Sequence, residues 1–189
     1  MKPNQLILIP GMPSFAWRLK GLEVFLKEKL LDYDVHLVSL LFGMLSFNEQ
    51  VQRVVDACIL PKRLVLFGHS HGGRIACAVA NIIKQRSPEA KIQVIIAGTP
   101  VVVRPNDVPW YDIPLYAMCP AFGEWPDITQ PSANYIGYYS EADTVVKSKF
   151  AKAGFTGKLI ELQNFSHGDL ISAKKMGPTL LELLVGRGI

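Results

Sequence analysis

The sequence has little cysteine, no long hydrophobic run and no dense block of one charge. Its cysteines are three, Cys58, Cys77 and Cys119, and this odd number without close spacing argues against a disulfide framework. No apolar stretch is long enough to span a bilayer, and the run at 6–9 is too short for a secretory signal. We therefore expect a protein of the cytoplasm without a transmembrane segment, with export by an unusual route left open.

The net charge of +4 is modest, and the basic residues are scattered along the chain. A nucleic-acid groove usually has a denser basic face with interleaved aromatic residues, so we expect no nucleic-acid partner. A mild attraction to anionic surfaces or substrates is left open. With 49% hydrophobic and 19% charged residues, the 189-residue chain is expected to form one globular domain over 1–189.

Short apolar runs alternate with helical patterns, which predicts an α/β fold: a mostly parallel sheet of about six strands with helices on both faces. Helices are expected over 15–30, after a capping box at Ser46 and Glu49, over 75–83, and over 170–184 with a bend near Gly177 and Pro178. The expected strands are 5–9, 34–40, 63–67, 92–97, 134–139 and 158–162.

The segment 99–131 breaks this alternation, because it carries seven prolines and is long for a loop inside a compact domain. It also holds Trp110, Tyr111 and Trp125. Two interpretations stay open: a proline-stiffened cover over the sheet edge, or a substrate-binding flap over the site. The three aromatic side chains are candidate substrate contacts and suit an apolar acyl group or a sugar ring equally well.

An apolar strand runs directly into Gly68-His69-Ser70-His71-Gly72, and a helical pattern follows. This is the strand-turn-helix context in which Gly-x-Ser-x-Gly presents a nucleophilic serine above a sheet. The glycines Gly68 and Gly72 are needed where side chains would meet each other or adjacent strands. The sequence thus predicts Ser70 as a nucleophile, against the alternative of a glycine turn with an incidental serine.

A serine nucleophile needs a general base and an orienting carboxylate. His167 follows the last predicted strand, where a loop reaches the carboxyl end of the sheet, so it is the expected base. Asp143 follows the fifth strand and gives the chain order Ser70, Asp143, His167, which the motif's fold uses. Glu141 and Asp169 are the rival carboxylates, and a helix-capping role for Asp143 is a further interpretation.

Backbone N–H groups are expected to stabilise the oxyanion of a tetrahedral intermediate. The N–H of His71 lies at a helix start. The loop after the first strand supplies the second donor, and because Pro10 and Pro13 have no N–H, Met12 leads and Gly11 comes next.

These segments resemble the α/β-hydrolase superfamily, and most closely its bacterial lipases and esterases. The resemblance rests on the turn at 68–73, on 97–100 and on the segments around Asp143 and His167, and it spans nearly the whole chain. It implies a single-domain α/β-hydrolase fold, a Ser-Asp-His triad and hydrolysis of a small-molecule or lipid-like acyl ester without cofactor or metal. Many relatives carry His-Gly where this chain has Pro10-Gly11, and the short chain implies a minimal cap domain or none.

Three alternatives remain. A thioesterase or amidase would use the same triad. A metal hydrolase would use His69, His71, His167 and Asp169, although only the His-x-His pair has a ligand spacing. A non-catalytic binding module of the same fold would use the aromatic segment to hold peptidoglycan, lipid or a partner protein.

Overall fold

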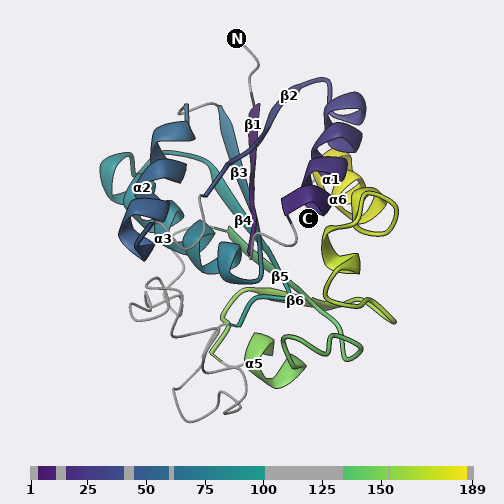
Figure 1. The fold of residues 1–189 in the computed structure, drawn as a ribbon. Helices are drawn as coiled ribbons and strands as arrows, with labels where there is room; N and C mark the ends of the chain where they lie inside the picture. The colour runs from purple at the N-terminus through teal and green to yellow at the C-terminus, as the bar shows by residue number, and fades with distance from the viewer. Residues whose placement is uncertain are drawn as a thin grey trace.

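The structure is a computed structural model, and it describes residues 4–11, 16–40, 45–59, 62–100, 134–152 and 154–186. Strands and helices alternate along most of the chain (Figure 1). The strands are β1 (Asn4–Ile9), β2 (Tyr33–Leu37), β3 (Arg63–His69), β4 (Ile92–Ala97), β5 (Asn134–Tyr139) and β6 (Lys158–Glu161). The helices are α1 (Ala16–Lys29), α2 (Phe47–Ala57), α3 (His71–Arg86), α5 (Ser148–Lys152), the 3-10 helix η4 (Asp169–Ile171) and α6 (Met176–Val185).

All six strands are parallel, in the order β2-β1-β3-β4-β5-β6, which confirms the expected sheet. Strand β2 is added on one side of β1, whereas β3 and the strands after it are added on the other side of β1. The loops after β1 and β3 therefore part at the carboxyl edge, where parallel α/β sheets bind their ligands. Ile9 pairs with Gly68 in the register, so the residues after these two strands meet at this edge.

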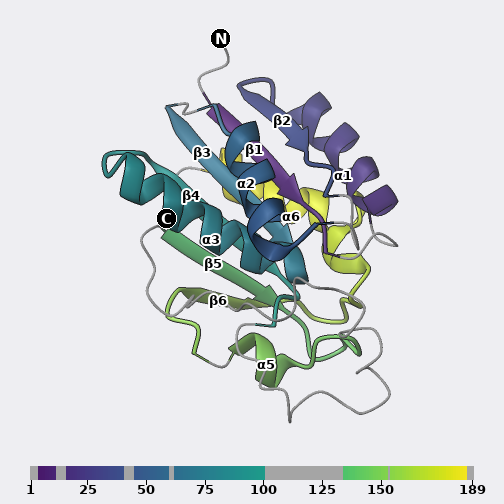
Figure 2. The same cartoon turned by 60° about the vertical axis from the view of Figure 1, so that its left-hand side comes forward.

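Helices cover both faces of the sheet, as Figures 1 and 2 show. Helices α2 and α3 share one apolar core with alternate strand residues such as Ile7, Leu66 and Val94. Helices α1 and α6 share the second core with the intervening residues, for example Leu8 and Phe67. The strands β3 and β4 are buried on both faces, which is why their sequences read as continuous apolar runs.

The capping box that begins α2 is confirmed: Ser46 Oγ accepts from the Glu49 backbone N–H, and the Glu49 carboxylate accepts from the Ser46 backbone N–H. The second strand ends at Leu37 rather than at residue 40. Most of the 99–131 segment lies outside the described residues.

The expectation of one bent helix over 170–184 was wrong. A 3-10 helix over 169–171 is separated by a turn from α6, which starts at Met176. Gly177 and Pro178 lie in the first turn of α6 and mark no bend. A proline is tolerated there because the first N–H groups of a helix have no intrahelical acceptor.

No helix in the described part of the chain has the length and apolar character needed to cross a membrane. Cys58 and Cys77 are free thiols, and burial raises the pKa of each to about 12. They therefore stay protonated and unreactive at neutral pH. Cys119 lies outside the described residues.

Candidate active site

Ser70 occupies a sharp turn between the end of β3 and the start of α3. Its φ of 54° and ψ of −125° lie in a region that side-chain-bearing residues rarely adopt. The Ser70 N–H donates to the Ala97 carbonyl at 2.9 Å, and the Ser70 carbonyl accepts from the Gly73 N–H at 3.0 Å. The neighbouring strand and the first turn of the helix thus hold the strained residue from both sides.

Close backbone packing explains the glycines of this turn. A methyl group at Gly68 would overlap the backbone of Gly72 and Gly73, and one at Gly72 would lie 2.6 Å from the Pro10 carbonyl oxygen. A methyl group at Gly11 would lie 2.7 Å from Ser70 Cβ. The loop after β1 therefore runs directly against the nucleophile candidate, as the switch point of the sheet requires.

His167 and Asp143 form a buried hydrogen bond, with 2.8 Å between His167 Nδ1 and Asp143 Oδ2. The other carboxylate oxygen of Asp143 accepts from the backbone N–H groups of Val145 and Val146, each at 2.9 Å. The helix-capping interpretation of Asp143 is wrong, because the next helix, α5, starts only at Ser148. One oxygen stabilises the local turn, while the second orients the imidazole.

The two rival carboxylates, Glu141 and Asp169, accept hydrogen bonds from other residues. Glu141 lies on the surface and accepts from Ser148 Oγ and Lys152 Nζ. Asp169 accepts from Ser166 and from Lys175 Nζ. Although burial acts to raise it, these hydrogen bonds hold the pKa of Asp169 below its usual value. Of the three carboxylates, Asp143 is the one that contacts the His167 imidazole.

Gly98, the residue after β4, lets the chain pass close to the Asp143–His167 pair. Its φ of +54° is in the left-handed region, and a methyl group there would lie 3.0 Å from Asp143 Oδ2 and 3.1 Å from His167 Nδ1. The Gly98 N–H donates to the Tyr138 carbonyl of β5. A side chain at this position would be strained and would press on the pair, so glycine is required.

His69 has a place that sequence reasoning missed. Its side chain is fully buried, and its Nε2 lies 3.1 Å from the His167 backbone carbonyl oxygen. The two rings lie 4.4 Å apart between centroids. Burial, with a smaller effect of His167, lowers the pKa of His69 well below the usual value. Alternation along β3 puts His69 on the same face of the sheet as Val65 and Phe67, and its ring lies there against the His167 ring.

His71 lies on the opposite side, edge-on to Phe47 of α2 with ring centroids 5.8 Å apart. Burial and the nearby Arg74 guanidinium lower the pKa of His71 to about 3. Because His69 and His71 contact different elements, the geometry argues against a shared metal. Among the described ranges, no three His, Cys, Asp or Glu side chains gather as metal ligands.

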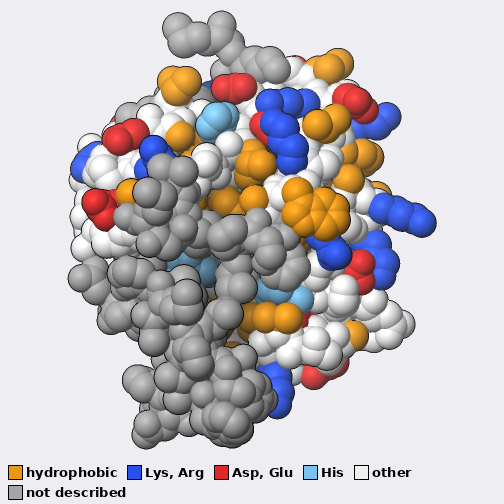
Figure 3. Space-filling view, in the orientation of Figure 1, with side chains coloured by type: hydrophobic (Ala, Val, Ile, Leu, Met, Phe, Trp, Pro, Cys, Tyr) orange, Lys and Arg blue, Asp and Glu red, His pale blue; other side chains and the backbone are white. Residues whose placement is uncertain are grey.

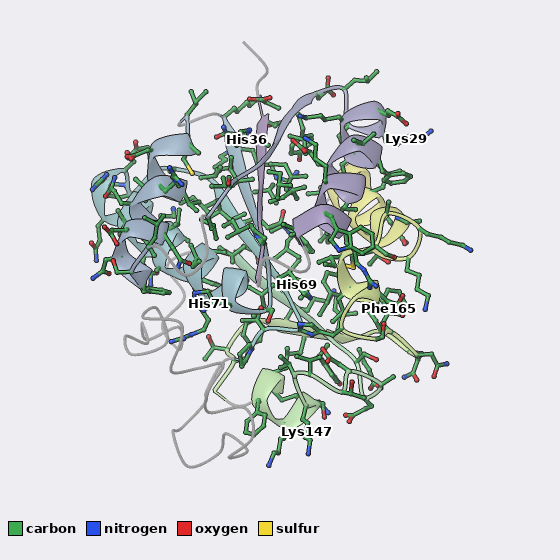
Figure 4. The ribbon with its side chains drawn as sticks, viewed as in Figure 1. Lys29, His36, His69, His71, Lys147 and Phe165 are labelled. Carbon is green, nitrogen blue, oxygen red and sulfur yellow. The ribbon has the colours of Figure 1, made fainter. Side chains whose placement is uncertain are left out.

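The fourth histidine of the sequence, His36, and the remaining oxyanion and substrate candidates lie in different places. Figure 4 places His36 on β2, apart from His69 and His71, where its side chain is exposed. Of the oxyanion donors, His71 and Gly11 are described, at the start of α3 and after β1. Outside the described residues lie Met12, Trp110, Tyr111 and Trp125.

Comparison with known proteins agrees with this architecture. The model of a family described as "Alpha/beta hydrolase family" matches residues 6–169, which include all the described site residues. A search of curated proteins gave no match.

Solved structures of similar fold include MGS-MChE2, an alpha/beta hydrolase enzyme from a sediment metagenome of the Mar Chica lagoon in Morocco. It is 16% identical, with a TM-score of 0.68 over 97% of this chain and 91% of that chain. A thermophilic esterase from Thermogutta terrifontis is 13% identical, with a TM-score of 0.66 over 96% and 89%. The thioesterase RedJ of prodiginine biosynthesis in Streptomyces coelicolor is 16% identical, with a TM-score of 0.65 over 98% and 91%. At these identities the likeness shows the fold alone.

Proposed function

We propose that this chain, which belongs to the alpha/beta hydrolase family, is a serine hydrolase that cleaves a carboxylic ester through an acyl-enzyme on Ser70. In this proposal His167 is the general base, Asp143 orients it, and the site needs no cofactor or metal. The substrate is a small-molecule or lipid-like acyl ester, and the site of action is the cytoplasm.

The buried hydrogen bond between Asp143 and His167 is the observation that carries the proposal. It is 2.8 Å long and lies at the carboxyl edge of the sheet. His167 packs there against His69, the residue that immediately precedes the strained Ser70. A carboxylate that holds Nδ1 leaves the other ring nitrogen, Nε2, as the proton acceptor, which is the arrangement a serine nucleophile requires.

The reaction then follows from the roles of these groups. Ser70 Oγ attacks the acyl carbonyl while His167 takes its proton, and the Asp143 carboxylate stabilises the imidazolium that forms. The backbone N–H of His71, together with Met12 or Gly11, stabilises the oxyanion. His167 returns the proton to the leaving alcohol, and water activated by His167 then releases the acid from Ser70.

Thioester or amide cleavage on the same residues is the alternative. The neighbouring structures include an esterase, a thioesterase and a deformylase, so fold likeness does not separate these chemistries. We favour the oxygen ester over the amide because an amine must be protonated before it leaves, whereas an alcohol needs less help from a general acid. We favour it over the thioester because the segments at 68–73 and 97–100 resemble those of bacterial esterases and lipases.

The test is covalent labelling of the intact chain with a fluorophosphonate, followed by mass spectrometry and ester hydrolysis assays. We expect one adduct on Ser70 in the wild-type protein and none in Ser70→Ala, with turnover lower by on the order of 10⁴-fold or more. Ser87→Ala, a change at the C-cap of α3, is the matched control and should label and turn over as the wild type does. A fully active Ser70→Ala protein would disprove the mechanism, and a binding module would give no adduct.

A further inference from the structure

Arg18 brings a positive charge to the loop that carries the proposed base. It lies in the first turn of α1, and its guanidinium packs against Gly168, the residue after His167. A methyl group added at Gly168 would overlap Arg18 Nη1 and lie 2.9 Å from Arg18 Cζ. The cation is therefore in van der Waals contact with the backbone next to His167.

An aromatic side chain holds this guanidinium in place. Arg18 Cζ lies 5.1 Å from the centroid of the Trp17 ring, which is within the range of a cation–π interaction. Trp17 is 68% exposed, while Arg18 is half-buried. Contact with an aromatic face orients a guanidinium but leaves its charge and its N–H donors available.

Arg18 differs from the other cations of this region in having no carboxylate partner within the described ranges. Lys20 and Lys27 both pair with Glu23, and Lys175 pairs with Asp169. The first turn of α1 contains no acidic residue. A cation there is disfavoured by the helix dipole, whose positive end is at the N-terminus. The charge of the Arg18 guanidinium and the positive end of the α1 dipole add, so both stabilise an anion bound at this place.

We propose that Arg18 binds an anionic group of the substrate, a carboxylate or a phosphate carried on the same molecule as the scissile ester. This inference rests on the proposed function and narrows its substrate class. A planar guanidinium donates two parallel N–H groups to a carboxylate or phosphate, which supplies orientation as well as affinity. The substrate would then be held at its charged end beside the base, with its acyl carbon directed toward Ser70.

An exposed aromatic ring beside the Arg18 guanidinium suits such a ligand. On the face drawn in Figure 3, histidine atoms are visible close to hydrophobic and basic side chains. Trp17 is one of the most exposed large hydrophobic side chains among the described residues. An ester with an apolar portion and one anionic group would contact the exposed ring and the guanidinium together.

The first test compares esters that differ only in charge. The pairs are 4-carboxyphenyl butyrate with its neutral 4-carbamoyl analogue, and monoethyl adipate with its terminal amide; 4-butyryloxyphenyl phosphate extends the test to a phosphate. We expect the wild-type kcat/KM to favour an anionic ester by about tenfold or more over the amide. In Arg18→Gln this ratio should fall to about one. Whether the first or the second pair responds shows on which side of the ester the anion lies.

Lys29→Gln is the matched control, because Lys29 is an exposed cation at the far end of α1 (Figure 4). It should keep both the basal rate and the charge preference. Equal kcat/KM values for acid and amide in the wild type would overturn the inference, as would an unchanged preference in Arg18→Gln. If neutral esters are hydrolysed and Ser70 is labelled while no charge preference is found, the proposed function stands and only the Arg18 anion site is overturned.

A binding measurement separates the two proposals further. An anion on Arg18 lies beside the Trp17 ring, so titration with benzoate should change tryptophan emission in the wild type. The change should be absent in Trp17→Phe and in Arg18→Gln, although Trp110 and Trp125 still emit. Saturable binding without any hydrolysis would support the anion site and contradict the proposed function. A benzoate response that persists in Arg18→Gln would overturn the anion site.

Discussion

The imidazole rings of His69 and His167 lie 4.4 Å apart between centroids, and His69 Nε2 is 3.1 Å from the His167 carbonyl oxygen. A carbonyl oxygen only accepts hydrogen bonds, so Nε2 of His69 carries the proton and donates it. Burial and the neighbouring His167 keep the pKa of His69 low, so the ring stays neutral. A neutral ring fixes the base loop without adding a second positive charge when His167 is protonated during catalysis.

Replacing His69 should therefore reduce turnover more than substrate binding. In His69→Met the volume is kept but the donor to the His167 carbonyl is lost, and we expect kcat to fall on the order of tenfold with little change in KM. In His69→Gln an amide N–H stands near the position of Nε2 and should restore part of kcat. The proton between His167 and Asp143 should give a downfield NMR signal that broadens in His69→Met and recovers in His69→Gln.

His36→Met is the control for this pair, because His36 is an exposed histidine on β2. Its kcat and downfield signal should match the wild type. Equal kcat values in His69→Met and His69→Gln, both close to wild type, would show that the contact has no positioning role.

Asp143→Asn should lower kcat by about 10³- to 10⁴-fold, because an amide in place of the carboxylate no longer stabilises the imidazolium and favours the wrong tautomer of His167. The Asn side-chain oxygen still accepts from Val145 and Val146, so the turn should persist. Ester hydrolysis with a thermal melt of each variant measures both effects.

Glu141→Gln provides the comparison, since Glu141 bonds to Ser148 and Lys152 on the surface. We expect its turnover to stay within about twofold of the wild type. A larger loss in Glu141→Gln than in Asp143→Asn would reverse the assignment of the carboxylate.

Stability should fall in acid because of His71. Burial and Arg74 lower the folded-state pKa of His71 to about 3, against 6.5 for an ordinary histidine. Below pH 6.5 His71 is therefore protonated in the unfolded chain, whereas in the folded chain it stays neutral until about pH 3. The stabilisation is complete above pH 6.5 and is lost as the pH falls toward 3.

For this single group the expected loss is about 2 kcal/mol of unfolding free energy between pH 7 and pH 5. Urea unfolding at the two pH values measures it. His71→Gln removes the titrating ring but keeps the backbone N–H, so its unfolding free energy should depend less on pH by a similar amount. An identical pH dependence in wild type and His71→Gln would contradict the assignment.

Much of the fold follows from local sequence patterns. The run at 63–69 is apolar because β3 is buried on both faces, and the capping box at Ser46 begins α2 through contacts between residues three apart. The prediction of one bent helix over 170–184 fails because a proline inside an apolar pattern favours a bend, whereas Pro178 lies in the first turn of α6. The position of this proline within the helix depends on where α6 starts, and α6 starts only after the 3-10 helix over 169–171.

The candidate site likewise combines a feature that local sequence patterns predict with contacts that they do not predict. The turn at Ser70 can be predicted from the sequence because the strand, the glycines and the helix lie within a few residues of each other. The contact between His69 and His167 joins residues 98 positions apart, and no local pattern signals it. The position of Arg18 beside Gly168 is likewise a product of how α1 packs on the sheet.

The sequence by itself determined the order of strands and helices and the strained serine turn, because hydrophobic periodicity and glycine placement act over short distances along the chain. Only the tertiary structure decided which carboxylate meets His167, which histidine supports its backbone and which cation stands beside it. Those choices depend on the sheet register and on helix packing, which bring distant residues together by burying apolar surface over the whole molecule.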